Sequence, residues 1–254
     1  MFAQERQQAI LHALQARSPL TVPALEKLLK ASPATVRRDL AFLESLGRIV
    51  RTHGGVMNPE QADGELPFDR KSRAALKTKA MLAETARAWV KPGQTVFIDA
   101  GSTTLPVGKA LLAQENLTVF TNSIPLLSER PVEGTRLISL GGEVRGVSLA
   151  LVGAGAMEWV RRIHVDIAFL GTSGMNAEGV TTTELSEAEI KSAILAKAGL
   201  TAVLADGSKW NRPAAIRYAE WNRIHHLLTD RELARDERQR ITAQGTQIHV
   251  VGKS

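Results

Sequence analysis

Small and hydroxyl-bearing residues follow a short apolar segment near the middle of the chain. Val96-Phe97-Ile98 precedes Asp99-Ala100-Gly101-Ser102-Thr103-Thr104, and a helix is predicted from Leu105 to Leu112. Small side chains let the backbone approach an anion, and N–H groups and hydroxyls at a helix N-terminus bind phosphate with help from the helix dipole. The loop therefore predicts a phosphate-binding site. The alternative is an ordinary strand-to-helix turn, in which glycine and serine serve only the geometry.

Three more polar or glycine-rich segments follow predicted strands in the same way. In parallel sheets, ligands bind at the carboxyl ends of the strands. Four loops in equivalent positions therefore favour one convergent site over four unrelated turns. The residues expected in that site are Asp99, Gly101, Ser102, Thr103, Thr104, Thr121, Asn122, Ser123, Gly141, Gly142, Asp206 and Lys209.

Another pattern, near the N-terminus, has the residue types that read DNA. Ser32 and Pro33 begin a predicted helix whose first turn is small and polar, so it can approach base edges in the major groove. Arginines follow within about one turn, where they suit phosphate or guanine contacts. A basic strand and a glycine turn come next, as in a DNA-contacting wing. The residues expected to contact DNA are Ser32, Thr35, Arg37, Arg38, Arg51 and His53. The alternative is a small helical bundle whose arginines form only a solvated face.

Residues 1–57 supply a framework for these arginines, namely three helices and a β-wing. The helices are predicted over Ala3–Ala16, over Val22–Lys30 with Thr21 as N-cap, and from Pro33 to a C-cap at Gly47. Residues 48–55 predict a strand and a tight turn. The apolar residues expected to face inward in the second and third helices are Leu25, Leu28, Leu29, Val36, Leu40, Leu43 and Leu46.

The remaining chain predicts a linker and a larger domain. Residues 58–70 hold two prolines, one glycine and four acidic residues, so they have little to bury. Residues 71–254 alternate helices, beginning with 74–90, with short apolar strands. This alternation favours an α/β domain with a mostly parallel sheet and helices on both faces. The strands are predicted at 95–98, 117–120, 136–140, 166–170, 201–204 and 226–229, with a further strand at 247–251 whose partner is not assigned.

Composition limits the class of protein. The absence of cysteine excludes disulfides, thiolate metal sites and cysteine nucleophiles. The net charge is +6, and residues 1–57 carry eight Lys or Arg against four Asp or Glu, which favours a polyanionic partner at that end. No apolar run is long enough to span a membrane, so a cytoplasmic location without membrane contact is expected. We expect no metal and no cofactor, because neither a dinucleotide-binding glycine pattern nor a P-loop occurs and the six histidines lack zinc-ligand spacing.

Two groups of motifs resemble the DeoR family of sugar-metabolism regulators. Thr35-Val36-Arg37-Arg38-Asp39-Leu40 and Arg51-Thr52-His53-Gly54-Gly55-Val56 resemble the DNA-binding domain of that family. The four loops named above and Phe169-Leu170-Gly171 match its D-A-G-[ST]-T-T, T-N-S, G-G, F-L-G and A-D-x-S-K motifs in order. The resemblance covers almost the whole chain. It implies a C-terminal domain that shares its fold with ribose-5-phosphate isomerase and related sugar-phosphate enzymes.

The resemblance also implies roles for individual residues. Gly101 to Thr104 would cradle phosphate, and Lys209 would add a point charge there. Asp99, Asn122 and Lys191 would face the sugar hydroxyls. Lys191 lies in the segment Glu187-Ala188-Glu189-Ile190-Lys191, whose alternative interpretation is an exposed helix with an i, i+4 Glu–Lys pair. The helix of Arg37 and Arg38 would enter the operator, while Asp39 would orient an arginine.

The sequence thus predicts a transcriptional regulator, expected to be a repressor, of a carbohydrate-metabolism operon. Operator binding would be controlled by a phosphorylated sugar or polyol, and a homodimer or homotetramer is expected. The alternative is a sugar-phosphate isomerase-like enzyme with an accessory DNA-binding domain. Isomerisation needs a base, and the segment 171–179 offers no histidine, while Asn176 is not a base. Only Asp99 remains as a candidate base, so we expect no enzyme.

Overall fold

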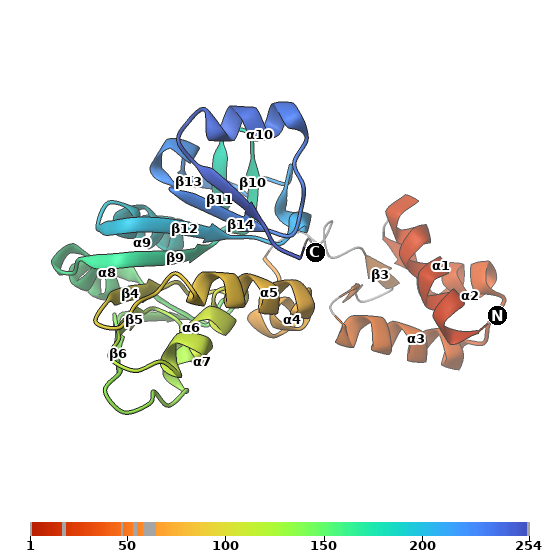
Figure 1. The fold of residues 1–254 in the computed structure, drawn as a ribbon. Coiled ribbons are helices and arrows are strands. Elements are labelled where there is room, and N and C mark those ends of the chain that lie inside the picture. The colour runs from red at the N-terminus through yellow and green to blue at the C-terminus, as the bar shows by residue number, and fades with distance from the viewer. Residues whose placement is uncertain (1, 17–18, 47, 53–54, 58–64, 253–254) are drawn as a thin grey trace. The chain divides into compact units, whose positions relative to one another are not determined.

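The computed structural model describes residues 2–16, 19–46, 48–52, 55–57 and 65–252. The chain divides into two compact units, Met1–Ala74 and Ala75–Ser254 (Figure 1). The expected C-cap Gly47 and the expected DNA contact His53 lie outside the described residues.

The N-terminal unit is a winged helix-turn-helix. It contains α1 (Ala3–Ala16), α2 (Val22–Leu29) and α3 (Pro33–Ser45), and a sheet of order β1-β3-β2 from β1 (Leu20–Thr21), β2 (Val50–Thr52) and β3 (Gly55–Met57). The two predicted N-caps are confirmed: Thr21 Oγ1 accepts from Ala24 N at 3.3 Å, and Ser32 Oγ accepts from Thr35 N at 3.3 Å. The second helix is one residue shorter than expected, because Lys30 is its left-handed C-cap.

A single apolar cluster holds this unit together. It joins the inward faces of the three helices to Ile49 and Val56 of the wing region. Leu28 and Leu46 were expected to face inward, and both expectations are wrong, since their exposed fractions are 55% and 42%. Leu28 is outside the face that Leu25 and Leu29 share, and Leu46 is the C-cap of α3, where the helical spacing has ended.

The range expected to be a linker ends in a short helix. α4 (Phe68–Arg73) begins inside the range 58–70, and the two units divide after Ala74 rather than after residue 70. Arg70 Nη2 of α4 donates to Glu44 Oε1 of α3 at 2.8 Å, so this helix is attached to the N-terminal unit. The helix buries Phe68. The sequence did not predict this helix, because prolines and acidic residues surround Phe68.

The C-terminal unit is built on a seven-stranded sheet of order β15-β14-β12-β9-β4-β5-β6, in which every neighbouring pair is parallel. This confirms the α/β fold class. The terminal strand that had no assigned partner pairs with β14 at the edge of the sheet. The strands are β4 (Thr95–Ile98), β5 (Thr118–Thr121), β6 (Arg136–Ser139), β9 (Val165–Gly171), β12 (Ala198–Leu204), β14 (His226–Thr229) and β15 (Gln247–Val250).

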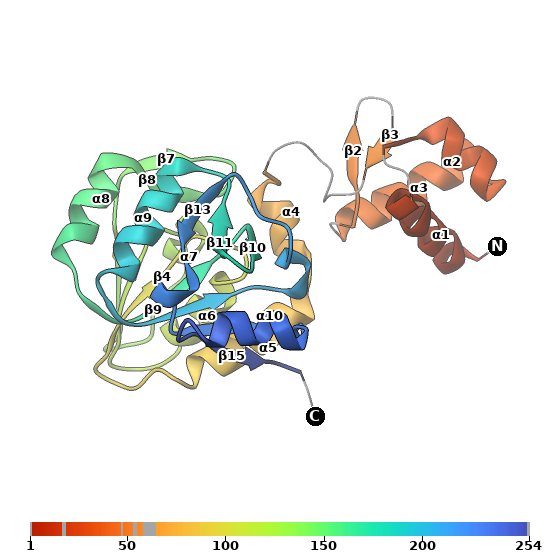
Figure 2. The same cartoon turned by 90° about the horizontal axis from the view of Figure 1, so that it is seen from above.

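Helices cover both faces of this sheet because successive strand residues point to opposite sides (Figures 1 and 2). Val96 and Ile98 of β4 join one apolar cluster, whereas Phe97 joins the other. The first cluster includes residues of α5 (Leu76–Arg87), α6 (Leu105–Leu112) and α7 (Ile124–Leu127). The second includes residues of α8 (Gly153–Arg162), α9 (Leu185–Leu195) and α10 (Arg235–Thr242).

Two small antiparallel additions extend the connections at the carboxyl ends of the strands. One is the hairpin of β7 (Glu143–Arg145) and β8 (Ala150–Val152), which follows β6. The other is the sheet of order β10-β11-β13, from β10 (Gly174–Asn176), β11 (Gly179–Thr182) and β13 (Ile216–Ala219). Short 3-10 helices, η2 (Gly207–Lys209) and η3 (Trp221–Arg223), complete the unit. No helix among the described residues is long and apolar enough to cross a membrane.

Candidate functional site

The centre of the candidate site is a buried carboxylate at the carboxyl end of β4. Asp99 is 1% exposed, and its Oδ2 accepts hydrogen bonds from Gly171 N at 2.9 Å and from the ammonium of Lys191. Burial raises the pKa of Asp99, because it disfavours the charged form, while the charge and hydrogen bond of Lys191 act in the opposite direction. The site thus contains a desolvated ion pair that joins β4, β9 and α9.

Lys191 is not on an exposed helix face. Its exposed fraction is 3%, and Nζ also donates to Gly171 O at 3.2 Å. The exposed i, i+4 pair with Glu187 is therefore the wrong interpretation of this segment. Glu187 is itself buried and accepts from Arg145 Nη1 at 3.0 Å and Thr182 Oγ1 at 3.4 Å. Glu187 and Lys191 thus have different partners, one from the β7–β8 hairpin and one from the loop after β4.

A tyrosine from β13 closes the same site. Tyr218 Oη donates to Gly171 O at 2.9 Å, and the ammonium of Lys191 lies 5.5 Å from the centre of the Tyr218 ring. Burial and the nearby Asp99 raise the pKa of Tyr218 well above its usual value, so its hydroxyl stays protonated and keeps donating. Sequence reasoning missed Tyr218, because its partner lies far away along the chain.

The expected phosphate loop has a second feature that sequence reasoning missed. Lys79, on the inward face of α5, is 3% exposed, and its Nζ donates to Ser102 Oγ at 3.0 Å. The sequence did hold a signal, since Lys79 shares the helix face of Leu82, Ala83 and Ala86 and so interrupts an apolar stripe. A lysine in such a position is buried at a cost unless it has partners. Here it places a cation beside the loop at the start of α6.

The other residues of this loop divide into two kinds. Thr104 is fully buried, and its hydroxyl contacts Asp99 O at 2.7 Å and Gly101 O at 3.0 Å, so it shapes the loop. Gly101, Ser102 and Thr103 are half-buried and stay accessible to a ligand.

The loop after β5 supports the loop after β4. Asn122 Oδ1 accepts from Ala100 N at 2.7 Å, and Thr121 Oγ1 donates to Ile98 O at 2.6 Å. Ser123 caps α7 by accepting from Leu126 N at 3.4 Å. All three residues are at most 1% exposed, so their polar atoms hold the backbone around Asp99.

Gly141 and Gly142 turn the chain from β6 into the β7–β8 hairpin. Both have positive φ, +65° and +107°, and a Cβ on Gly142 would lie 2.4 Å from Val152 O. The close approach of two backbones therefore requires glycine at Gly142. The hairpin that follows brings Arg145 to α9, where it also bonds Ser148 Oγ at 3.0 Å.

The loop after β12 is connected to α5 by hydrogen bonds through Asp230. Asp206 Oδ1 accepts from Ser208 N at 3.0 Å and caps η2. Gly207 N donates to Asp230 Oδ1 at 2.7 Å, and Asp230 Oδ2 accepts from Thr78 Oγ1 at 2.7 Å. Lys209 is half-buried, and within the described chain its ammonium has no hydrogen-bond or ion-pair partner.

The expected DNA-contacting side chains lie on the surface of the N-terminal unit. Arg37, Arg38 and Arg51 are exposed, and none of the three forms an ion pair with another described residue. Ser32 is exposed and Thr35 half-buried, with their hydroxyls 2.9 Å apart at the start of α3.

Asp39, by contrast, faces inward on α3. It is 3% exposed, and its carboxylate accepts from Arg6 Nε at 2.7 Å and Arg6 Nη2 at 3.3 Å. It therefore orients an arginine of α1, as expected, and leaves the exposed face of α3 with positive charge.

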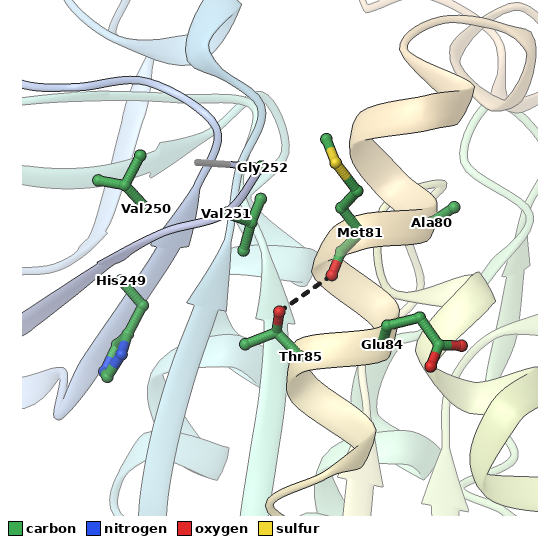
Figure 3. A pocket seen from close by; sticks show the side chains of 8 residues that line it. All are labelled: Ala80, Met81, Glu84, Thr85, His249, Val250, Val251 and Gly252. Carbon is green, nitrogen blue, oxygen red and sulfur yellow. Dashed lines mark hydrogen bonds between the residues drawn. The ribbon is translucent and has the colours of Figure 1, made fainter. Parts of the chain in front are cut away.

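A pocket between α5 and β15 lies apart from these residues (Figure 3). Its lining includes Met81, Glu84, Thr85, His249 and Val251, and it shares no residue with the candidate site. The site is therefore defined by its polar contacts and not by this pocket.

Comparison with known proteins decides the family. A model described as the DeoR C terminal sensor domain matches residues 74–231, and one described as the DeoR-like helix-turn-helix domain matches residues 6–62. The HTH-type transcriptional regulator GlpR of Haloferax volcanii is 32% identical over 98% of both chains. The HTH-type transcriptional repressor GlcR of Bacillus subtilis is 32% identical over 91% of this chain and 90% of that one. The chain belongs to the DeoR family.

Membership of the DeoR family confirms the resemblance seen in the motifs and the prediction of a DNA-binding transcriptional regulator with a sensor domain. GlpR and GlcR are both named as transcriptional regulators and not as enzymes. A solved structure of D-ribose-5-phosphate isomerase is similar with a TM-score of 0.40 and 15% identity, over 53% of this chain and 54% of that one.

Proposed function

We propose that this DeoR-family protein represses a carbohydrate-metabolism operon and leaves its operator when a phosphorylated sugar or polyol binds the C-terminal unit. The observation that carries the effector site is the buried ammonium of Lys79 beside Ser102, in the loop that begins α6. A buried cation, backbone N–H groups and a helix N-terminus together suit a phosphate dianion.

The effector site is proposed to have two parts. Gly101, Ser102, Thr103, Lys79 and Lys209 bind the phosphate. Asp99, Asn122 and Lys191 face the hydroxyls of the carbon chain, with Tyr218 fixing Gly171 between them. The remaining expected residues hold these loops in place, namely Thr104, Thr121, Ser123, Gly141, Gly142 and Asp206.

The operator is proposed to bind the exposed face of α3 and the wing. Ser32 and Thr35 approach the base edges, while Arg37, Arg38 and Arg51 contact phosphates or guanines. A DNA contact of His53, which lies outside the described residues, stays a prediction from the sequence. We propose that two or more copies of the chain present their DNA-binding units to repeated half-sites, as a homodimer or homotetramer in the cytoplasm.

The proposal also excludes catalysis as the function of the site. Oδ2 of Asp99, the one candidate base, already accepts from Gly171 N and Lys191, so only Oδ1 is left to face the ligand. Enzymatic conversion of a bound sugar phosphate is therefore the competing hypothesis that the experiment must separate.

The test compares Lys79→Met with Lys77→Met, an exposed lysine in the same turn of α5. Glycerol 3-phosphate, glucose 6-phosphate and fructose 6-phosphate are screened by thermal shift, and operator affinity is measured by fluorescence anisotropy. Loss of one charge-assisted contact, worth about 1.5–3 kcal/mol, should weaken effector binding roughly 10–100-fold in Lys79→Met. Operator affinity without effector should not change, and Lys77→Met should behave as the wild type.

Two outcomes would contradict the proposal. In the first, Lys79→Met keeps the wild-type response to effector. In the second, the ligand recovered after incubation is chemically altered, which would support the enzyme. Ser102→Ala provides a second variant, which retains the charge of Lys79 but removes the hydroxyl it contacts.

A further inference from the structure

The first turn of α5, residues 76–79, is bonded directly to one of the proposed phosphate-binding loops and, through Asp230 after β14, to the other. Lys79 Nζ donates to Ser102 Oγ at 3.0 Å in the loop after β4. Thr78 Oγ1 donates to Asp230 Oδ2 at 2.7 Å, and the other oxygen of Asp230 accepts from Gly207 N at 2.7 Å in the loop after β12. The residues that hold these loops in place thus meet in this one turn.

This turn is also the first element after the boundary between the two units. Only Ala74 and Ala75 separate α4 from α5 along the chain. Ala75 has φ of 51° and ψ of 38°, the left-handed region that alanine disfavours, and its carbonyl accepts from Lys79 N at 3.0 Å. Such a conformation persists only where the surrounding contacts impose it. The turn that follows Ala75 is bonded through Lys79 to Ser102 and through Thr78 to Asp230.

On the other side of the junction, α4 is attached to the DNA-reading helix. Arg70 Nη2 donates to Glu44 Oε1 at 2.8 Å, and these two side chains are 32% and 25% exposed. Glu44 lies on α3, the helix that carries Arg37 and Arg38. This ion pair thus joins α4 to the helix proposed to enter the operator.

We propose that the first turn of α5, Ala75 and α4 form the path by which effector binding controls operator binding. The effector stabilises one arrangement of Lys79 and Thr78 with the loops, and the junction conveys that arrangement along the chain to Arg70, Glu44 and α3. The inference rests on the proposed function. A ligand shifts such an equilibrium only through a difference in its affinity for the two arrangements.

The test removes one hydrogen bond of this path without touching a ligand contact. Thr78→Val breaks the bond to Asp230, and Thr85→Val is its control. Among the described residues, Thr85 Oγ1 donates only to Met81 O of the same helix, at 3.1 Å. The effector is the sugar phosphate that stabilises the wild type most. Its affinity for the protein and the affinity of the protein for the operator are measured separately. Operator affinity is then measured again at saturating effector. In Thr78→Val each separate affinity should stay within about twofold of the wild type. The effector-induced change in operator affinity, commonly about 5–150-fold, should fall at least about fivefold. Thr85→Val should keep it.

A second pair of variants tests the other end of the path. Arg70→Gln removes the contact with Glu44, and Arg73→Gln removes an exposed charge from the same helix. The effector-induced change should decrease in Arg70→Gln and persist in Arg73→Gln. Full retention of that change in Thr78→Val or in Arg70→Gln would overturn the inference.

Amide hydrogen exchange without effector separates this inference from the proposed function. If no sugar phosphate alters the thermal stability or operator affinity of the wild type, the proposed effector is wrong. Hydrogen exchange still tests whether the turn of α5 is coupled to α4. In ligand-free Thr78→Val, faster exchange should appear in the first turn of α5 and in α4. Faster exchange in α5 with unchanged α4 would show that the turn transmits nothing to the DNA-binding unit.

Discussion

At the scale of single residues, Asp99 shows how much of the site depends on one desolvated charge. The side chains of Asp99 and Lys191 are 2% and 4% exposed, so each is the buried counterion of the other. The same carboxylate fixes Gly171 N, while Lys191 and Tyr218 both donate to Gly171 O. Removing either charge leaves a buried ion without a counterion, which is far more costly than losing a surface pair.

Asp99→Asn should therefore lower the free energy of unfolding by about 3–5 kcal/mol, because Lys191 stays buried without its counterion. Urea denaturation measures the loss. The matched control is Asp166→Asn, an exposed carboxylate that accepts from Thr95 N at 2.7 Å and should cost below about 1 kcal/mol. Equal losses in the two variants would show that the buried pair contributes little.

At the scale of elements, two adjacent glycines decide where the β7–β8 hairpin lies. The hairpin holds Arg145 against Glu187 of α9, so its position affects the same helix that carries Lys191. A Cβ added to Gly141 would meet no other atom within 4 Å, whereas Gly142 lies against the backbone of Val152. Of the two, only Gly142 must be glycine to avoid a collision with the backbone of Val152.

Gly142→Ala should lower the free energy of unfolding by about 3 kcal/mol, through overpacking against Val152 O and a positive φ that alanine disfavours. Gly141→Ala has the backbone strain without the collision and should cost about 1 kcal/mol. Thermal or urea unfolding of the two variants measures the difference. A smaller loss for Gly142→Ala than for Gly141→Ala would contradict this account of the turn.

At the scale of the whole molecule, charge and chemistry are divided between the two units. The arginines expected to contact DNA are exposed and form no ion pair with a described residue, whereas Arg6 and Arg70 are paired with Asp39 and Glu44. Phosphate contacts release counterions, so they appear in the salt dependence of binding.

Arg38→Ala should weaken operator binding and reduce the slope of log Kd against log salt by about 1, because one phosphate contact is lost. Fluorescence anisotropy between low and moderate salt measures the slope. Arg130→Ala, an exposed arginine of the C-terminal unit, is the control and should leave the slope unchanged. An unchanged slope in Arg38→Ala would exclude Arg38 from the phosphate contacts.

Sequence alone determined the features that depend on neighbours along the chain. Most of the expected helices, to within a few residues at their ends, the N-caps Thr21 and Ser32, and most strands follow from local periodicity and capping. The positions of the loops follow from them. The family follows from contiguous motifs, which also depend on no distant contact.

Tertiary structure decided what depends on partners far apart in sequence. Asp99 and Lys191 are 92 positions apart, and only the pairing of β4 with β9 and the packing of α9 bring them together. The partner of β15, the burial of Lys79 beside Ser102 and the attachment of α4 to α3 have the same origin. The spacing of residues shows which side chains share one face of a helix or strand. Only the tertiary fold decides which other element that face packs against.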